Sequence, residues 1–89
     1  MKSSLIDGAN VVFGSRVLFY YIIKEFSNVR VIKVVGEFLN SFKSVRGDEY
    51  ITIMVSTYND PVATQKMHFS VSDIVKDSFT PNYKENEYE

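Results

Sequence analysis

The residues that could do chemistry are scattered along this chain, and none stands at a spacing that a reaction requires. His68 is the single histidine and cysteine is absent, which excludes a histidine metal cluster and a thiolate zinc site. The motif Gly14-Ser15-Arg16 lacks the longer glycine frame and the lysine of a phosphate loop. The carboxylates fall at expected turns, caps or helix ends, where charges are solvated. The sequence therefore predicts a protein that is not an enzyme and uses no cofactor and no metal.

Basic side chains are concentrated in the first half of the chain. Residues 1–47 contain seven Lys or Arg against three Asp or Glu, whereas residues 48–89 contain three against eight. We interpret this asymmetry as a solvated surface or as a basis for complementary self-association. The alternative interpretation is a basic face that contacts the phosphates of a nucleic acid. Such a basic face would contain Arg16, Lys24, Arg30, Lys33, Lys43 and Arg46.

Aromatic residues make up 15% of the chain, with seven Phe and six Tyr, which is more than a small core readily absorbs. A sheet of three strands also leaves edges that can pair with another chain. The aromatic excess and the open edges together predict a homodimer or other homo-oligomer. Tyrosine is the residue type enriched at protein interfaces. The residues expected at this interface are Tyr20, Tyr21, Tyr50 and Tyr58.

Length and hydropathy indicate one cytoplasmic domain. A chain of 89 residues cannot divide its core between two domains. Asp7 interrupts the apolar character of the N-terminus, which argues against a secretion signal. The longest apolar run spans residues 17–23, much shorter than the ~20 residues of a membrane-spanning helix. No membrane association is therefore expected, and the absence of cysteine fits a reducing compartment.

Residues 10–26 fit two structures. A helix places Val12, Phe19 and Ile22 on one side, and Asn10 could cap its N-terminus. Two strands broken at Gly14-Ser15 would suit the valine, phenylalanine, tyrosine and isoleucine content equally well. We favour the helix, because Ser27-Asn28 provides a stop.

The remaining segments predict an α+β fold. Residues 29–35 are β-branched at nearly every position and predict a strand. Residues 49–58 and 64–71 alternate apolar and polar side chains around Asn59-Asp60-Pro61, which predicts a hairpin over 49–71. Short helices are expected over 37–45 and 72–79. We therefore expect a small antiparallel sheet with helices covering one face.

The C-terminus predicts a domain boundary. Residues 80–89 contain no aliphatic side chain and four charged ones, so they have little surface to bury. We expect residues 1–79 to form a single globular domain and residues 80–89 to form a disordered acidic tail.

Gly36 and the segment Asp48-Glu-Tyr-Ile-Thr-Ile-Met-Val55 resemble the motif of Sm-like RNA-binding barrels. The resemblance implies an SH3/Sm-like β-barrel in which residues 10–26 form an N-terminal helix. Thr52 stands where the family has its RNA-contacting asparagine, and Ser70 to Asp73 lacks the Arg-Gly pair of the second motif. This barrel is the alternative to the α+β fold.

Taken together, these patterns predict a function that does not involve catalysis. We expect a small module that binds a protein partner as a regulator, adaptor or inhibitor. Its richness in Lys, Asn, Tyr, Ile, Ser and Phe is typical of AT-rich bacteria and of their phages and mobile elements. A small nucleic-acid-binding protein that uses the basic N-terminal half is the alternative.

Overall fold

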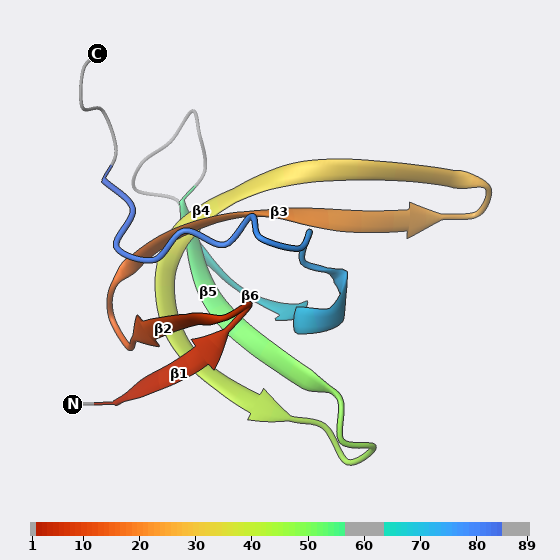
Figure 1. Ribbon diagram of the computed structural model, residues 1–89. Coiled ribbons are helices and arrows are strands. Elements are labelled where there is room, and N and C mark those ends of the chain that lie inside the picture. Colours follow the sequence, from red (N-terminus) through yellow and green to blue (C-terminus); the bar gives the residue numbers. More distant parts are fainter. Residues whose placement is uncertain (1, 57–63, 85–89) are drawn as a thin grey trace.

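The computed structural model describes residues 2–56 and 64–84, which are nearly all β (Figure 1). β1 and β2 form a two-stranded hairpin, and the next four strands form an antiparallel sheet in the order β3-β4-β5-β6. The elements are β1 (Ser3–Ile6), β2 (Ala9–Val12), β3 (Arg16–Glu25), β4 (Asn28–Lys43), β5 (Glu49–Ser56), β6 (Thr64–Ser70) and the 3-10 turn η1 (Val71–Asp73).

The helix expected over 10–26 is wrong. β2 ends at Val12, and Gly14, at a φ of +95°, helps turn the chain into β3. β3 then pairs with β4 over its whole length, from Arg16↔Glu37 to Glu25↔Asn28. The β-branched and aromatic side chains that permit either structure are better accommodated on this pleated surface.

The α+β fold class is therefore wrong, and so is the N-terminal helix of the Sm-like alternative. Residues 37–43 belong to β4, and residues 72–79 contain the end of the 3-10 turn, a second turn at residues 76–77 and otherwise irregular or bridged chain, with no α-helix. A β-bulge between Phe38 and Asn40 explains the misleading helical spacing of the former segment. The extra residue reverses the inward and outward alternation, so Phe38 is buried while Phe42 is exposed.

The expected hairpin over 49–71 is present. β5 and β6 pair antiparallel from Tyr50↔Ser70 to Ser56↔Thr64. The residues that connect these strands, 57–63, lie outside the described part of the chain. The strand expected over 29–35 is also present as the first half of β4.

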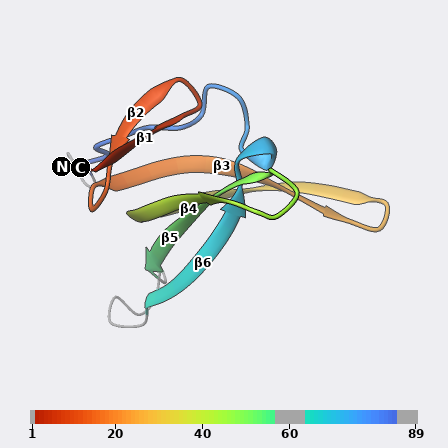
Figure 2. The ribbon, with the colours of Figure 1, turned by 90° about the horizontal axis from the view of Figure 1, so that it is seen from below.

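The core lies between the concave face of the four-stranded sheet and a cover made by the β1–β2 hairpin and the C-terminal residues (Figure 2). Phe19 on β3 is fully buried at its centre. Its ring meets Phe69 edge-on at 5.3 Å and stacks on Phe79 at 5.4 Å between centroids. The buried core residues are Ile6, Val11, Val17, Phe19, Val34, Phe38, Ile51, Ile53, Phe69, Ile74 and Phe79.

Residues 74–84, which we name the return segment, run back along the free edge of β3. Leu18 and Thr80 exchange two backbone hydrogen bonds of 3.1 and 2.7 Å, and the Tyr83 N–H donates to the Arg16 carbonyl at 2.8 Å. Thr80 and Tyr83, both within the range expected to be a tail, thus contact the domain. Residues 85–89 lie outside the described residues. Within residues 2–56 and 64–84, no helix is long and apolar enough to cross a membrane.

Candidate interaction surface

The end of the β3–β4 hairpin projects beyond the rest of the molecule (Figure 1). β5 pairs with β4 only from Gly36 onward, and the return segment reaches along β3 only as far as Tyr21, opposite Ile74. Residues 22–33, which we name the arm, therefore form a two-stranded ribbon with no further strand beside it among the described residues. Because isolated two-stranded hairpins are marginally stable in water, the arm is an unusual feature to leave uncovered.

Large apolar side chains are exposed on the arm. Phe26 at its tip is fully exposed, and Val29 and Val31 on β4 have 66% and 54% of their surface accessible. Single exposed apolar residues are common, but neighbouring ones on a projecting element are typical of interaction sites. The strand pattern of residues 29–35, apolar at nearly every position, is the sequence signal that could have revealed this surface.

The tip of the arm carries backbone strain. Phe26 and Ser27 connect the two strands, and Phe26 adopts a φ of +52°. This left-handed conformation costs a residue with a Cβ about 1–2 kcal/mol, and glycine or asparagine is the usual choice at such a turn. A bulky aromatic residue in that position, with its ring in solvent, gains nothing for the isolated domain. Observed strain of this kind is a reason to infer a function for the residue.

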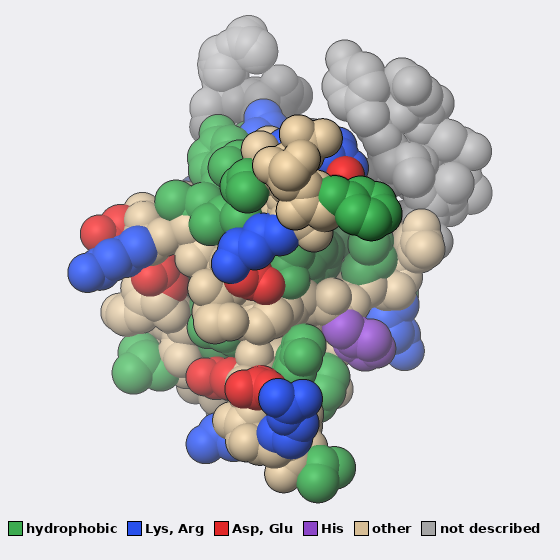
Figure 3. Space-filling view, turned by 90° about the vertical axis from the view of Figure 1, so that its right-hand side faces the viewer, with side chains coloured by type: hydrophobic (Ala, Val, Ile, Leu, Met, Phe, Trp, Pro, Cys, Tyr) green, Lys and Arg blue, Asp and Glu red, His purple; other side chains and the backbone are tan. Residues whose placement is uncertain are grey.

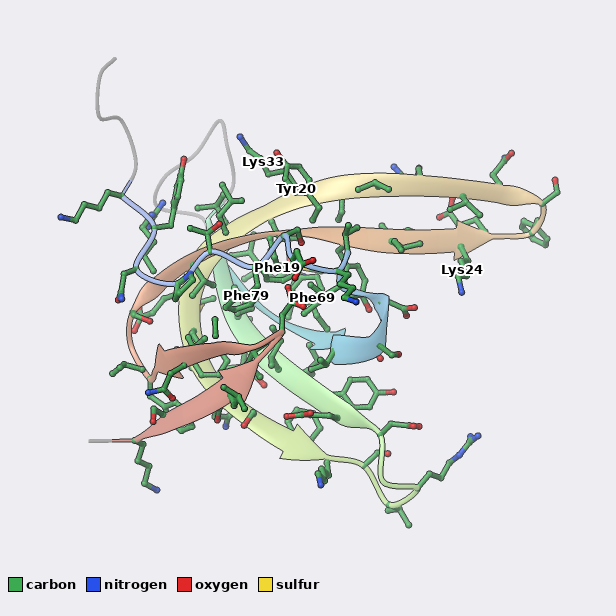
Figure 4. The ribbon with its side chains drawn as sticks, in the orientation of Figure 1. Phe19, Tyr20, Lys24, Lys33, Phe69 and Phe79 are labelled. Carbon is green, nitrogen blue, oxygen red and sulfur yellow. The ribbon has the colours of Figure 1, made fainter. Side chains whose placement is uncertain are left out.

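Strand alternation divides the side chains of the arm between two faces. Tyr21 pairs with Ile32 on the face that continues the core, and Tyr20 pairs with Lys33 on the opposite, outer face. Figure 4 shows Tyr20 and Lys33 on the side of the ribbon away from Phe19, Phe69 and Phe79. By the same alternation, the outer face of the arm carries Ile22, Lys24, Val29, Val31 and Lys33.

The four tyrosines expected at an interface do not lie together. Tyr20 is exposed on the outer face, next to the arm. Tyr21 packs against Phe69, at 4.9 Å between ring centroids, and its hydroxyl accepts a hydrogen bond from the Ser70 N–H at 3.0 Å. Tyr50 is half-buried and stacks on Phe42. Tyr58 lies outside the described residues.

The six basic residues also fall into separate groups. Lys24, Arg30 and Lys33 belong to the arm, and Arg30 lies 3.6 Å from Glu25 in an exposed ion pair. Lys43 and Arg46 lie at the other end of β4 and in the turn that follows it. Arg16 begins β3 and is half-buried. Figure 3, viewed from the side on which the arm ends, shows basic and acidic side chains intermixed with hydrophobic ones.

His68 is exposed on β6, where its Nδ1 lies 2.9 Å from the buried Thr52 hydroxyl and its ring packs edge-on against Phe42. Among the described residues, no three His, Asp or Glu side chains are grouped so that they could hold a metal ion. The candidate interaction surface is therefore the arm, with its exposed apolar side chains.

The fold and the arm together define a small β domain: a curved antiparallel sheet, covered on its concave face, with a projecting β-hairpin. No protein-family model, no curated protein and no solved structure matches this chain.

Proposed function

We propose that this protein is a non-catalytic interaction module, acting as a regulator, adaptor or inhibitor, that binds a protein partner through the arm. The observation that carries the proposal is the group of exposed apolar side chains formed by Phe26, Val29 and Val31. It is supported by the left-handed backbone of Phe26, which a partner contact would offset.

Burial of the surface still exposed on Phe26, Val29 and Val31 would contribute favourably to the binding of a partner. Full burial of a Val or Phe side chain contributes about 1.5–3 kcal/mol, and three such residues together resemble the small clusters that dominate protein interfaces. Part of that gain is lost to the entropy of association. A preformed hairpin lowers a different cost, the entropy lost in ordering the interface, because its backbone is already held by the β3–β4 ladder.

Site-specific photo-crosslinking tests the proposal. A benzophenone amino acid is placed at position 26 of the full chain, and in a matched control at position 45, another fully exposed apolar site in the turn between β4 and β5. We expect the probe at position 26 to give a defined crosslinked product in cells, whereas the probe at position 45 gives none. The Val31→Asp change should abolish the product. Equal crosslinking from the two positions, or none from either, would contradict the proposal.

Nucleic-acid binding is a second candidate function, supported by one arrangement on the outer face. Lys33 is directly opposite Tyr20, so a cation lies across from an exposed aromatic ring on the outer face. Basic side chains next to aromatic ones can bind a single strand by phosphate contacts and base stacking. The wide separation of Lys43 and Arg46 from the arm makes this function the weaker of the two.

A further inference from the structure

The edge of β4 that faces away from β3 has no partner strand over residues 28–35 among the described residues, because β5 begins its pairing at Gly36. This edge is long, contains no proline and carries Val29, Val31 and Val35. Edges of this kind readily pair with another strand, and proteins that must remain monomeric usually block them with proline, bulges or charges.

The hydrogen-bond pattern of the hairpin determines which backbone groups point to this edge. Two residues connect the strands, so Glu25 and Asn28 form the first hydrogen-bonded pair, and such pairs then alternate with non-bonded ones. Val29, Val31, Lys33 and Val35 occupy the non-bonded positions, where the N–H and C=O groups point outward. Of these, Val35 lies beside Gly36, where the pairing with β5 begins.

The opposite edge of the hairpin supports this assignment. Leu18 and Tyr20 on β3 occupy the same non-bonded positions in the alternation. Their outward groups bond to the return segment: Leu18 exchanges bonds with Thr80, and the Tyr20 carbonyl accepts from the Val75 N–H at 2.9 Å. The return segment therefore satisfies the β3 edge as far as Tyr20 and leaves Ile22 and Lys24 without a described partner, whereas on the β4 edge nothing described satisfies Val29, Val31 and Lys33.

A second copy of the same edge can pair with it without placing like charges directly opposite each other. An antiparallel pair of β4 strands centred on Val31 would place Val31 opposite itself and Val29 opposite Lys33. This register uses the outward groups of Val29, Val31 and Lys33 and places no two like charges directly opposite each other. Centring the pair on Arg30 or on Lys33 would instead place identical cations face to face, which is destabilising. A pair centred on Ile32 also avoids opposing like charges, but it would place Val29 opposite Val35, beside Gly36, where β5 begins its pairing with β4. The register centred on Val31 is therefore the one that avoids like charges and stays clear of β5.

We infer that the partner of the arm is a second copy of this chain, and that the two β4 edges pair antiparallel with Val31 at the twofold axis. This inference rests on the proposed function and specifies its partner. The dimer contains a continuous ribbon of four strands in the order β3-β4-β4-β3, and it merges the exposed valines of both outer faces. The regulator or adaptor is then a twofold-symmetric assembly.

Proline substitution tests the backbone pairing. In Val31→Pro the outward N–H is lost, but no β3–β4 hydrogen bond is removed; the matched control Val31→Thr keeps the N–H and nearly the same shape. By light scattering at high micromolar concentration, the native chain and Val31→Thr should have twice the chain's mass of 10.2 kDa. Val31→Pro should raise the dimer dissociation constant about thirtyfold, as expected for the loss of two backbone hydrogen bonds.

A second measurement does not depend on the fold of the proline variant. The chain contains no cysteine, so a single cysteine reports one contact. Val31→Cys should form an intermolecular disulfide in a redox buffer, because directly paired Cα atoms lie about 5.5 Å apart. Val45→Cys, at a more accessible site, should not form one.

A monomeric native chain, a dimer that Val31→Pro leaves unchanged, or equal disulfide yields at positions 31 and 45 would overturn the inference. These results are separable from the test of the proposed function. A monomer whose position 26 crosslinks to a different protein would refute the self-pairing and keep the interaction module. A chain that is monomeric and gives no crosslink would refute both.

Discussion

Replacing Phe79 with alanine should strongly destabilise the domain, because the return segment completes the core. The Phe79 side chain is 93% buried by the remainder of the fold, with 7% of its surface accessible, and its ring stacks on Phe19 at an interplanar angle of 14°. Its backbone N–H points to the Asp7 carboxylate at 3.4 Å. Phe79 thus joins β3, the β1–β2 turn and the C-terminal residues.

The size of the effect follows from this packing. Substituting a buried Phe by Ala usually costs about 3–5 kcal/mol, and we expect about 3 kcal/mol here because an extended segment can partly collapse into the cavity. A chain of 89 residues has a free energy of unfolding of roughly 4–13 kcal/mol. The loss would lower the melting temperature by about 12 °C or more.

Urea unfolding followed by circular dichroism measures this loss, with Val45→Ala as the control at the same protein concentration. Val45 is a fully exposed apolar residue in the turn between β4 and β5, outside the arm, so its truncation should change the free energy of unfolding by less than about 0.5 kcal/mol. A loss below about 1 kcal/mol for Phe79→Ala would refute the reasoning. It would mean that the return segment lies on the domain without contributing to its core.

Two further predictions follow from the sheet and from its charges. Gly36→Ala should lower the free energy of unfolding by about 1–3 kcal/mol in the same assay, because a Cβ would overlap the Met54 carbonyl oxygen and lie 2.7 Å from Ile53 Cγ2; unchanged stability would show that β4 and β5 can separate freely. Fluorescence anisotropy should detect no binding of DNA or RNA tighter than about micromolar at physiological salt. Steeply salt-dependent binding that Lys24→Glu and Lys33→Glu abolish would instead promote the second candidate function.

Local sequence was enough to predict several strands. The β-branched run at 29–35 is confirmed as a strand, and the alternating segments 49–58 and 64–71 are confirmed over Glu49–Ser56 and Thr64–Ser70, because each pattern fits a pleated surface. Residues 57–58 lie outside the described residues, and Val71 belongs to the 3-10 turn. The apolar run at 29–35 also predicted a strand that is covered on both faces, because it carries apolar side chains on both. It could not show that the structure leaves part of that strand exposed.

Tertiary structure decided the rest. Residues 10–26 became strands because β4 offered a partner for the whole of β3, a long-range pairing that local spacing does not encode. The bulge after Phe38 reversed the faces of β4, and only the pairing with β5 reveals it. Tyr20 and Tyr21 are neighbours of the same type, yet one is exposed and the other packs in the core. Successive side chains of a strand point to opposite faces of the sheet, so Tyr20 and Tyr21 must differ. Which of the two faces is covered by the core is determined only by the tertiary structure.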